Sequence, residues 1–149
     1  MKKLFLVFFS CCLISFIVSG CDNNIDTNYV EGVVKLDGQP LPGASVTFIP
    51  VAENGESAGG FSDDSGLYRL TSTYGKGGKG ALTGDYIVIV TKSKSVPLEK
   101  PITYDDGSVT TETTEHILPA IYRDRTKSPL KFSVVEGKNR FDIDLSAKP

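Results

Sequence analysis

Apolar and polar residues alternate along several short segments of the chain, which is the two-residue period of strands buried on one face. Residues 29–36 show this alternation and predict an inward face of Val30, Gly32, Val34 and Leu36. Residues 44–49 repeat it, with an inward face of Ala44, Val46 and Phe48. Between them, residues 37–43 ("DGQPLPG") combine glycine and proline, which favour turns. The domain is therefore predicted to begin with two strands joined by a turn.

Three later segments also have strand character. In residues 67–72, we expect Tyr68 and Leu70 to face inward. Residues 85–92 ("DYIVIVTK") form the most continuous apolar run of the domain, so they are predicted to be the central strand, buried on both faces. Residues 130–145 predict two strands around a turn at 136–139. Their inward residues are Phe132, Val134, Phe141, Ile143 and Leu145, and their outward residues are Arg140, Asp142 and Asp144.

The number and spacing of these segments indicate the fold class. No segment shows the 3.6-residue period of an amphipathic helix. Six or seven short strands separated by turns are typical of an all-β, antiparallel β-sandwich. Residues 29–149 are long enough to form one such domain with its own core.

The first twenty residues have the features of a leader that is removed. Lys2 and Lys3 precede an uncharged apolar run at 4–18, which is short for a bilayer span. The run ends in "VSGC" (18–21), which resembles the bacterial lipobox, where a cysteine is acylated and the chain is cut before it. We therefore predict a lipoprotein signal peptide at 1–20, a lipidated Cys21 and a polar tether at 21–28. An ordinary secretory signal or an uncleaved anchor is the alternative.

Composition limits the classes of partner and the cellular location expected for the protein. Loss of Lys2 and Lys3 leaves 14 of the 16 basic residues against 18 acidic ones, which argues against nucleic acid as a partner. Cys11 and Cys12 lie in the leader, so only Cys21 remains and no disulfide or cysteine metal site is expected. Acyl chains on Cys21 would hold the protein on a lipid bilayer. The predicted location is the cell envelope, facing the periplasm or the exterior.

Several blocks of the sequence resemble a known family. Residues 30–50, 61–72 and 82–92 are similar, in order, to the carboxypeptidase regulatory-like domain, a transthyretin-like (prealbumin-like) β-sandwich of about seven strands. Residues 118–145 resemble the C-terminal half of small bacterial lipoproteins that carry this domain. The resemblance implies a non-catalytic adhesion, glycan-binding or scaffold module, although in large enzymes the domain accompanies a catalytic one. Residues 93–117 match nothing in the family and are predicted to be an insertion within the domain at 29–149.

Two aspartate pairs are the first candidates for chemistry. Asp63 and Asp64 precede Ser65 and Gly66, and residues 104–107 ("YDDG") repeat this type of signal. Aspartate followed closely by glycine favours a turn, because the carboxylate accepts hydrogen bonds from the backbone two residues on. A calcium loop needs oxygen ligands at alternate positions and a closing glutamate, and that spacing is missing here. We interpret both pairs as turns rather than as cation sites.

The only histidine, His116, follows the threonine-rich stretch 109–115 ("VTTETTE"). One imidazole is too few for the common zinc and iron sites built from several histidines, so we expect a structural or solvated side chain and no cofactor. The threonine-rich stretch predicts an exposed strand edge. A polar surface for a glycan or a protein partner is the alternative.

These observations favour a lipid-anchored, non-catalytic β-sandwich used for binding or for organisation of the envelope, with an envelope protein or a glycan as partner. The candidate ligand surface consists of Asp63, Asp64, Tyr104, Asp105, Asp106 and His116. One alternative is a small metal-assisted hydrolase that uses the same carboxylates and His116. Another is an accessory subunit whose exposed strand edge pairs with another envelope protein.

Overall fold

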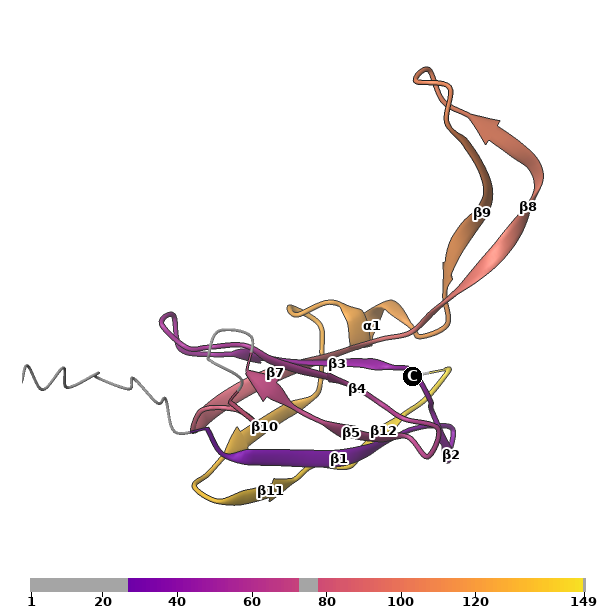
Figure 1. Ribbon diagram of the computed structural model, residues 1–149. Coiled ribbons are helices and arrows are strands. Elements are labelled where there is room, and N and C mark those ends of the chain that lie inside the picture. Colours follow the sequence, from indigo (N-terminus) through magenta and orange to yellow (C-terminus); the bar gives the residue numbers. More distant parts are fainter. Residues whose placement is uncertain (1–26, 73–77, 149) are drawn as a thin grey trace, which may run out of the picture.

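The computed structural model describes residues 27–72 and 78–148, and within them the chain forms two sheets packed face to face, with a long hairpin standing away from both (Figure 1). The all-β sandwich predicted from the sequence is thus confirmed. The predicted signal peptide and Cys21 lie outside the described residues.

The first sheet is built around β1 (Tyr29–Leu36). β2 (Gln39–Pro40) and β5 (Leu67–Arg69) pair with it in antiparallel fashion. β11 (Lys138–Arg140) and β12 (Ile143–Leu145) pair with it in parallel. The prediction of antiparallel pairing therefore holds for most of the sandwich but is wrong for β11 and β12. Side-chain periodicity carries no information on the direction of the neighbouring strand.

The second sheet has the order β10-β7-β3-β4-β6. Its strands are β3 (Ser45–Pro50), β4 (Ala58–Phe61), β6 (Thr71–Ser72), β7 (Gly84–Thr91) and β10 (Lys131–Val134). β7 lies inside the sheet, between β3 and β10, but the middle position of the five strands belongs to β3 and not to β7 as predicted. The expected burial of both its faces is wrong. Tyr86, Val88 and Val90 point into the core and are buried, whereas Ile87 and Ile89 point to the other face of the sheet and are only half-buried.

One short segment joins the two sheets. Residues 67–69 pair with β1 in the first sheet, and residues 71–72 pair with β4 in the second. Leu70, between them, is buried, and its backbone N–H donates to the carbonyl of Val30 at 3.0 Å. The chain therefore closes one side of the sandwich by passing from one sheet to the other.

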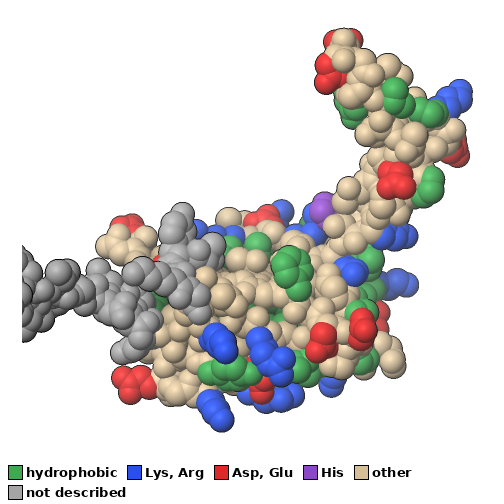
Figure 2. Space-filling model, viewed as in Figure 1, with side chains coloured by type: hydrophobic (Ala, Val, Ile, Leu, Met, Phe, Trp, Pro, Cys, Tyr) green, Lys and Arg blue, Asp and Glu red, His purple; other side chains and the backbone are tan. Residues whose placement is uncertain are grey.

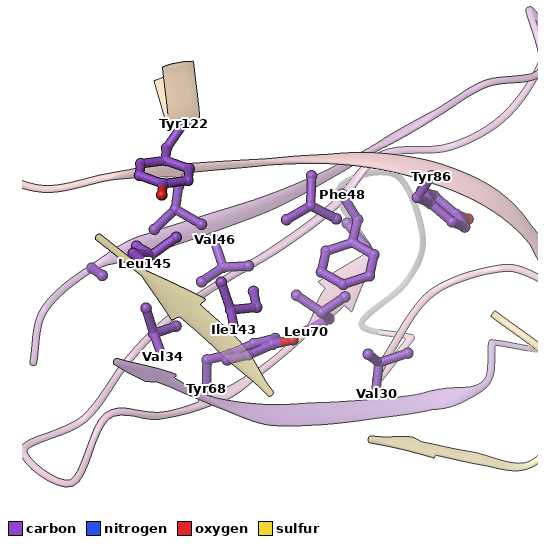
Figure 3. Close-up of a cluster of buried hydrophobic side chains, with 14 of the residues drawn as sticks. Val30, Val34, Val46, Phe48, Tyr68, Leu70, Tyr86, Tyr122, Ile143 and Leu145 are labelled. Atoms are coloured by element: carbon purple, nitrogen blue, oxygen red, sulfur yellow. The ribbon is translucent and has the colours of Figure 1, made fainter. Parts of the chain in front are cut away.

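The core between the sheets consists of the predicted inward residues of several strands (Figure 3). Val30, Val34, Val46, Phe48 and Tyr68 are fully buried. Phe48 is central, because its ring lies within 6.5 Å of four other aromatic rings, those of Tyr68, Tyr86, Phe132 and Phe141. Such ring pairs add stability beyond the burial of their area.

The C-terminal region differs from its prediction in two places. Lys138 and Asn139 belong to β11 and not to a turn. The Asn139 side chain is buried, and its polar atoms are satisfied there: its amide donates to the carbonyl of Val135 at 2.8 Å and its oxygen accepts from the N–H of Val135 at 3.0 Å. Phe141 lies between β11 and β12 and is half-buried, stacked on Phe132 with the ring centroids 4.7 Å apart.

The insertion predicted at 93–117 is a β-hairpin of β8 (Ser93–Thr103) and β9 (Val109–His116). It is followed by the four-residue helix α1 (Ala120–Arg123), which buries Tyr122. No helix in the described part of the chain is long and apolar enough to cross a bilayer.

Candidate functional site

The hairpin of β8 and β9, residues 93–116, is the most unusual feature of the molecule, and we refer to it as the arm. It projects from the sandwich into solvent (Figure 1), and nearly all of its side chains are exposed. Within the described residues, the two strands form a separate sheet and pair only with each other. Loops and projections held by a rigid scaffold are common positions for binding residues, which makes the arm the first candidate for function.

The base of the arm is fixed to the core. β7 and β8 are separated only by Lys92, whose carbonyl accepts a hydrogen bond from Ile117 at 2.9 Å. Leu118, which follows at once, is buried in the core. Both strands of the arm therefore continue directly from packed parts of the sandwich.

The tip of the arm is a turn specified by its sequence. Tyr104 and Ser108 are joined by a backbone hydrogen bond of 2.9 Å, and Gly107 has a positive φ of 81°, which glycine adopts without strain. Asp106 accepts hydrogen bonds from the backbone and hydroxyl of Ser108, at 2.9 and 2.7 Å. The hydroxyl bond, above all, lowers the pKa of the Asp106 carboxyl. The predicted turn at 104–107 is confirmed, and Tyr104 stands exposed on it.

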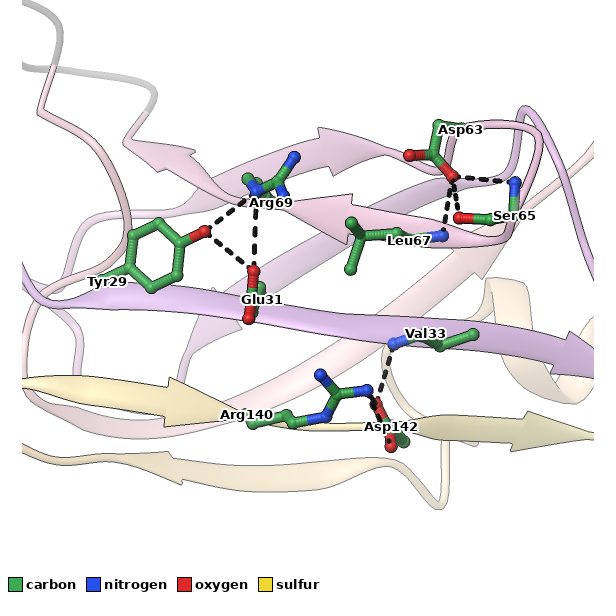
Figure 4. A network of polar contacts seen from close by, with 9 residues as sticks. All are labelled: Tyr29, Glu31, Val33, Asp63, Ser65, Leu67, Arg69, Arg140 and Asp142. Atoms are coloured by element: carbon green, nitrogen blue, oxygen red, sulfur yellow. Dashed lines mark hydrogen bonds and ion pairs between the residues drawn. The ribbon is translucent and has the colours of Figure 1, made fainter.

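The other aspartate pair forms a turn in the same way (Figure 4). One carboxylate oxygen of Asp63 accepts from the hydroxyl and N–H of Ser65, at 2.7 and 2.9 Å, and from the N–H of Leu67 at 3.0 Å. These bonds, led by that of the Ser65 hydroxyl, lower the pKa of the Asp63 carboxyl. Asp63 therefore supports the turn into β5 and leaves one oxygen for solvent.

The candidate ligand surface does not come together as one site. Tyr104, Asp105 and Asp106 lie at the tip of the arm, whereas His116 pairs with Ser93 at its base. An extended strand as long as β8 spans about 30 Å, so tip and base are far apart. Asp63 and Asp64 belong to a turn of the sandwich. Within residues 27–72 and 78–148, no three of the His, Cys, Asp and Glu side chains are placed to hold a metal ion.

The outer face of the first sheet carries a polar network that sequence reasoning missed (Figure 4). Arg69 donates to the Tyr29 hydroxyl at 2.9 Å, and that hydroxyl donates to Glu31 at 2.8 Å. Arg69 also lies 3.5 Å from Glu31. Alternation along β1 could have placed Tyr29 and Glu31 on one face, but the pairing of β1 with β5 was needed to bring Arg69 beside them.

Two surface hollows of about 380 Å³ lie on the sandwich and contain none of the predicted site residues. One is lined by Tyr29, Arg69, Leu70, Thr71 and Lys79. The other is lined by Val51, Asp85, Tyr86, Ile87, Lys131, Phe132 and Ser133. Asp85 is occupied there by a hydrogen bond from the Ser133 hydroxyl. Neither hollow is lined by a histidine or a cysteine, and the Ser133–Asp85 pair has no third group beside it to complete a catalytic set among the lining residues, so the arm is the stronger candidate.

The two edges of the arm differ in chemistry. β8 contains Pro97 and Pro101, and its pairing with β9 is irregular between Pro97 and Ile102. β9 contains no proline and has four threonines, which favour extended backbone. Figure 2 shows acidic side chains at the tip and the histidine near the base. The predicted exposed strand edge at 109–115 is thus present, as part of β9.

Comparisons with known proteins add little to this description. Neither the known protein families nor the curated proteins include a match to the chain. Among solved structures, the major pilin subunit of Bacillus cereus is similar over 78% of this chain and 30% of its own length, with 17% identity and a TM-score of 0.37. The chain thus spans about a third of that pilin. A likeness this weak supports no assignment of function.

Proposed function

We propose that the chain is a lipid-anchored envelope protein whose non-catalytic β-sandwich holds the arm away from the membrane for binding to another protein. The anchor is the predicted lipidated Cys21, and the sandwich is the rigid mount. The observation that carries the proposal is the arm itself, a two-stranded sheet that stands in solvent and whose strands pair only with each other among the described residues.

The position of the arm relative to the tether supports this proposal. Asn28, where the tether enters the fold, bonds to Thr83 and Ala81, just before β7 begins. The arm leaves the sandwich at the other end of β7, after Thr91. Eight residues of strand span about 25 Å, so tether and arm occupy opposite ends of the sandwich. An anchor on Cys21 would place the arm on the side facing away from the bilayer.

The family resemblance points the same way. Similarity to the carboxypeptidase regulatory-like domain covers the sandwich and implies a module that binds or scaffolds, whereas residues 93–117 lie outside that similarity. The arm is therefore the part in which this chain would differ from its relatives. The hydrolase alternative has weaker support, because its carboxylates and His116 occupy three separate places.

The test is photo-crosslinking in cells from the tip of the arm. Tyr104 is replaced by benzoylphenylalanine in the full-length, anchored protein, and adducts are identified by mass spectrometry. Phe61, which is also exposed but lies on the sandwich, receives the same replacement as a matched control. We expect a discrete protein adduct from position 104 and none from position 61. The same sample reports whether Cys21 carries lipid and residues 1–20 are gone.

Two results would contradict the proposal. No protein adduct from position 104, with Cys21 lipidated, would remove the protein-binding role and direct attention to a glycan. An unmodified Cys21 would remove the anchor.

A further inference from the structure

The arm is a two-stranded sheet without a third strand among the described residues. A two-stranded hairpin alone in water is marginally stable, and three or more strands are needed for independent stability. In the described part of the chain, β8 and β9 each pair on one side only. Their outer edges carry unpaired backbone N–H and C=O groups, which are a template for another strand.

The two outer edges are not equally suited to pairing. Proline has no N–H to donate, and irregular pairing twists a strand away from a neighbour. Both features protect β8, through Pro97, Pro101 and the irregular stretch between Pro97 and Ile102. β9 pairs with β8 in regular register from Glu112 to His116. The open edge is therefore that of β9.

The register shows which residues of β9 present their backbone outward. Ile117 donates to the carbonyl of Lys92, so these two form a hydrogen-bonded pair. Hydrogen-bonded and non-bonded pairs alternate in an antiparallel ladder. Glu115 and Thr113 therefore direct their backbone groups toward β8, whereas Glu112, Thr114 and His116 direct theirs to the open edge.

The side chains of β9 are complementary to a second copy of the same strand. In an antiparallel arrangement centred on Thr114, Glu112 of each copy lies opposite His116 of the other, and Thr113 lies opposite Glu115. No like charges oppose each other in this register, whereas centring on Glu112 would set two carboxylates side by side. Both glutamates already have partners within the arm, since Glu112 accepts from Ser95 and Glu115 lies 3.0 Å from Lys94.

We propose that the partner of the arm is the arm of a second copy, joined through the β9 edges into a four-stranded sheet. This inference rests on the proposed function and names its partner. The contact is isologous and closes on itself as a two-fold dimer, the commonest symmetry of oligomers. The two-fold axis of an antiparallel pair is perpendicular to its strands. If this axis lies along the membrane normal, the paired arms lie parallel to the bilayer at the far end of the sandwiches and both tethers reach the same bilayer. Confinement to the membrane raises the effective concentration of one arm for the other.

The test is a disulfide at the symmetry axis. In the proposed register Thr114 faces itself across a hydrogen-bonded pair, where the Cα atoms lie about 5.5 Å apart, within the range of a disulfide. Thr114→Cys is introduced into the full-length, anchored protein, and dimers are scored on non-reducing gels. Ser95→Cys is the matched control, because Ser95 lies directly opposite Thr114 across the arm but on the protected edge. The unsubstituted protein, run on the same gels, shows how much dimer its natural cysteines form.

We expect most of the Thr114→Cys protein to run as a dimer that reductant dissociates, with Ser95→Cys and the parent at least five-fold less dimeric. A monomeric Thr114→Cys protein, or equal dimers from both variants, would overturn the inference. If Thr114→Cys stays monomeric while position 104 captures a different envelope protein, the inference fails and the proposed function stands. If position 104 captures nothing and no dimer forms, both fail.

Discussion

Gly32 shows most clearly how closely the two halves of the first sheet approach. A β-carbon built on Gly32 would lie 1.8 Å from the carbonyl oxygen of Phe141 and 3.0 Å from the ring of Tyr68. That carbonyl also accepts a hydrogen bond from the Tyr68 hydroxyl at 2.7 Å, so it cannot move away freely. Alternation along β1 predicted that Gly32 faces inward. The lack of space for a side chain there could not be predicted, because it arises from the parallel pairing of β1 with the C-terminal strands.

We predict that Gly32→Ala destabilises the protein by about 3 kcal/mol, because backbone and not a flexible side chain must give way. Gly59→Ala is the control within a strand, since its β-carbon would make only an ordinary contact of 3.5 Å with the Val46 carbonyl. We expect a change within about 1 kcal/mol for it. Urea unfolding of both variants measures the difference, and equal losses would show that the approach at Gly32 is not limiting.

Asp63 gives a pH-dependent prediction. Hydrogen bonds, first of all from the Ser65 hydroxyl, lower the pKa of its carboxyl in the folded state. A carboxyl with a lowered folded pKa adds stability above its unfolded pKa of ~3.9, and that stability is lost as the pH falls through the folded value. Asp63→Ala should therefore lower the melting temperature at pH 7, and the gap to the parent should narrow toward pH 3. Asp64→Ala serves as the control, and a gap that widens on acidification would contradict this account.

The same aspartate device recurs in three turns, of which residue-level reasoning predicted the two at Asp63 and Asp106 but not the one at Asp124. Asp63, Asp106 and Asp124 each accept from the hydroxyl and N–H of a serine or threonine two residues on. A local pattern of this kind is readable from sequence, because all its partners are neighbours in the chain. The separation of Asp63, Tyr104 and His116 could not be read from the sequence, because these residues are placed by elements far apart in the fold.

At the scale of elements, strand positions were predicted well and strand partners were not. The inward residues Tyr68 and Leu70 were identified correctly, but their short segment divides between two sheets, which no periodicity indicates. Residues 93–117 had no apolar stripe to fix a register, so the sequence predicted an exposed insertion but not a regular hairpin. The edge of β9 became a candidate site only when the structure showed that no other strand in residues 27–72 and 78–148 pairs with it.

The arm should be dispensable for folding of the sandwich, because β8 and β9 pair only with each other in the described residues. We predict that replacing residues 94–115 by Asn-Gly, a two-residue hairpin turn, changes the melting temperature by less than about 4 °C, or about 1 kcal/mol for a domain of this size. Differential scanning calorimetry of the monomeric protein tests this. A larger drop would show that the arm also stabilises the core.

At the scale of the whole molecule, the sequence predicted an all-β sandwich and a location in the cell envelope. The structure showed the arm and the direction in which it projects. Length, strand count and turn spacing were sufficient for the class of fold. The direction of the arm depends on where β7 begins and ends relative to Asn28, which is a tertiary fact.

The placement of Asn28 and the arm at opposite ends of β7 also determines how the domain would bear tension. A pull between the proposed membrane anchor and the proposed arm dimer would enter at the start of β1 and leave at the end of β7, so it would run along the strands. β7 is held on one side by six paired residues of β3 and on the other by four of β10. These ladders would be loaded in shear, with their hydrogen bonds sharing the force instead of opening one by one. With the proposed anchor and arm dimer in place, the sandwich would act as a link that resists stretching between its two ends.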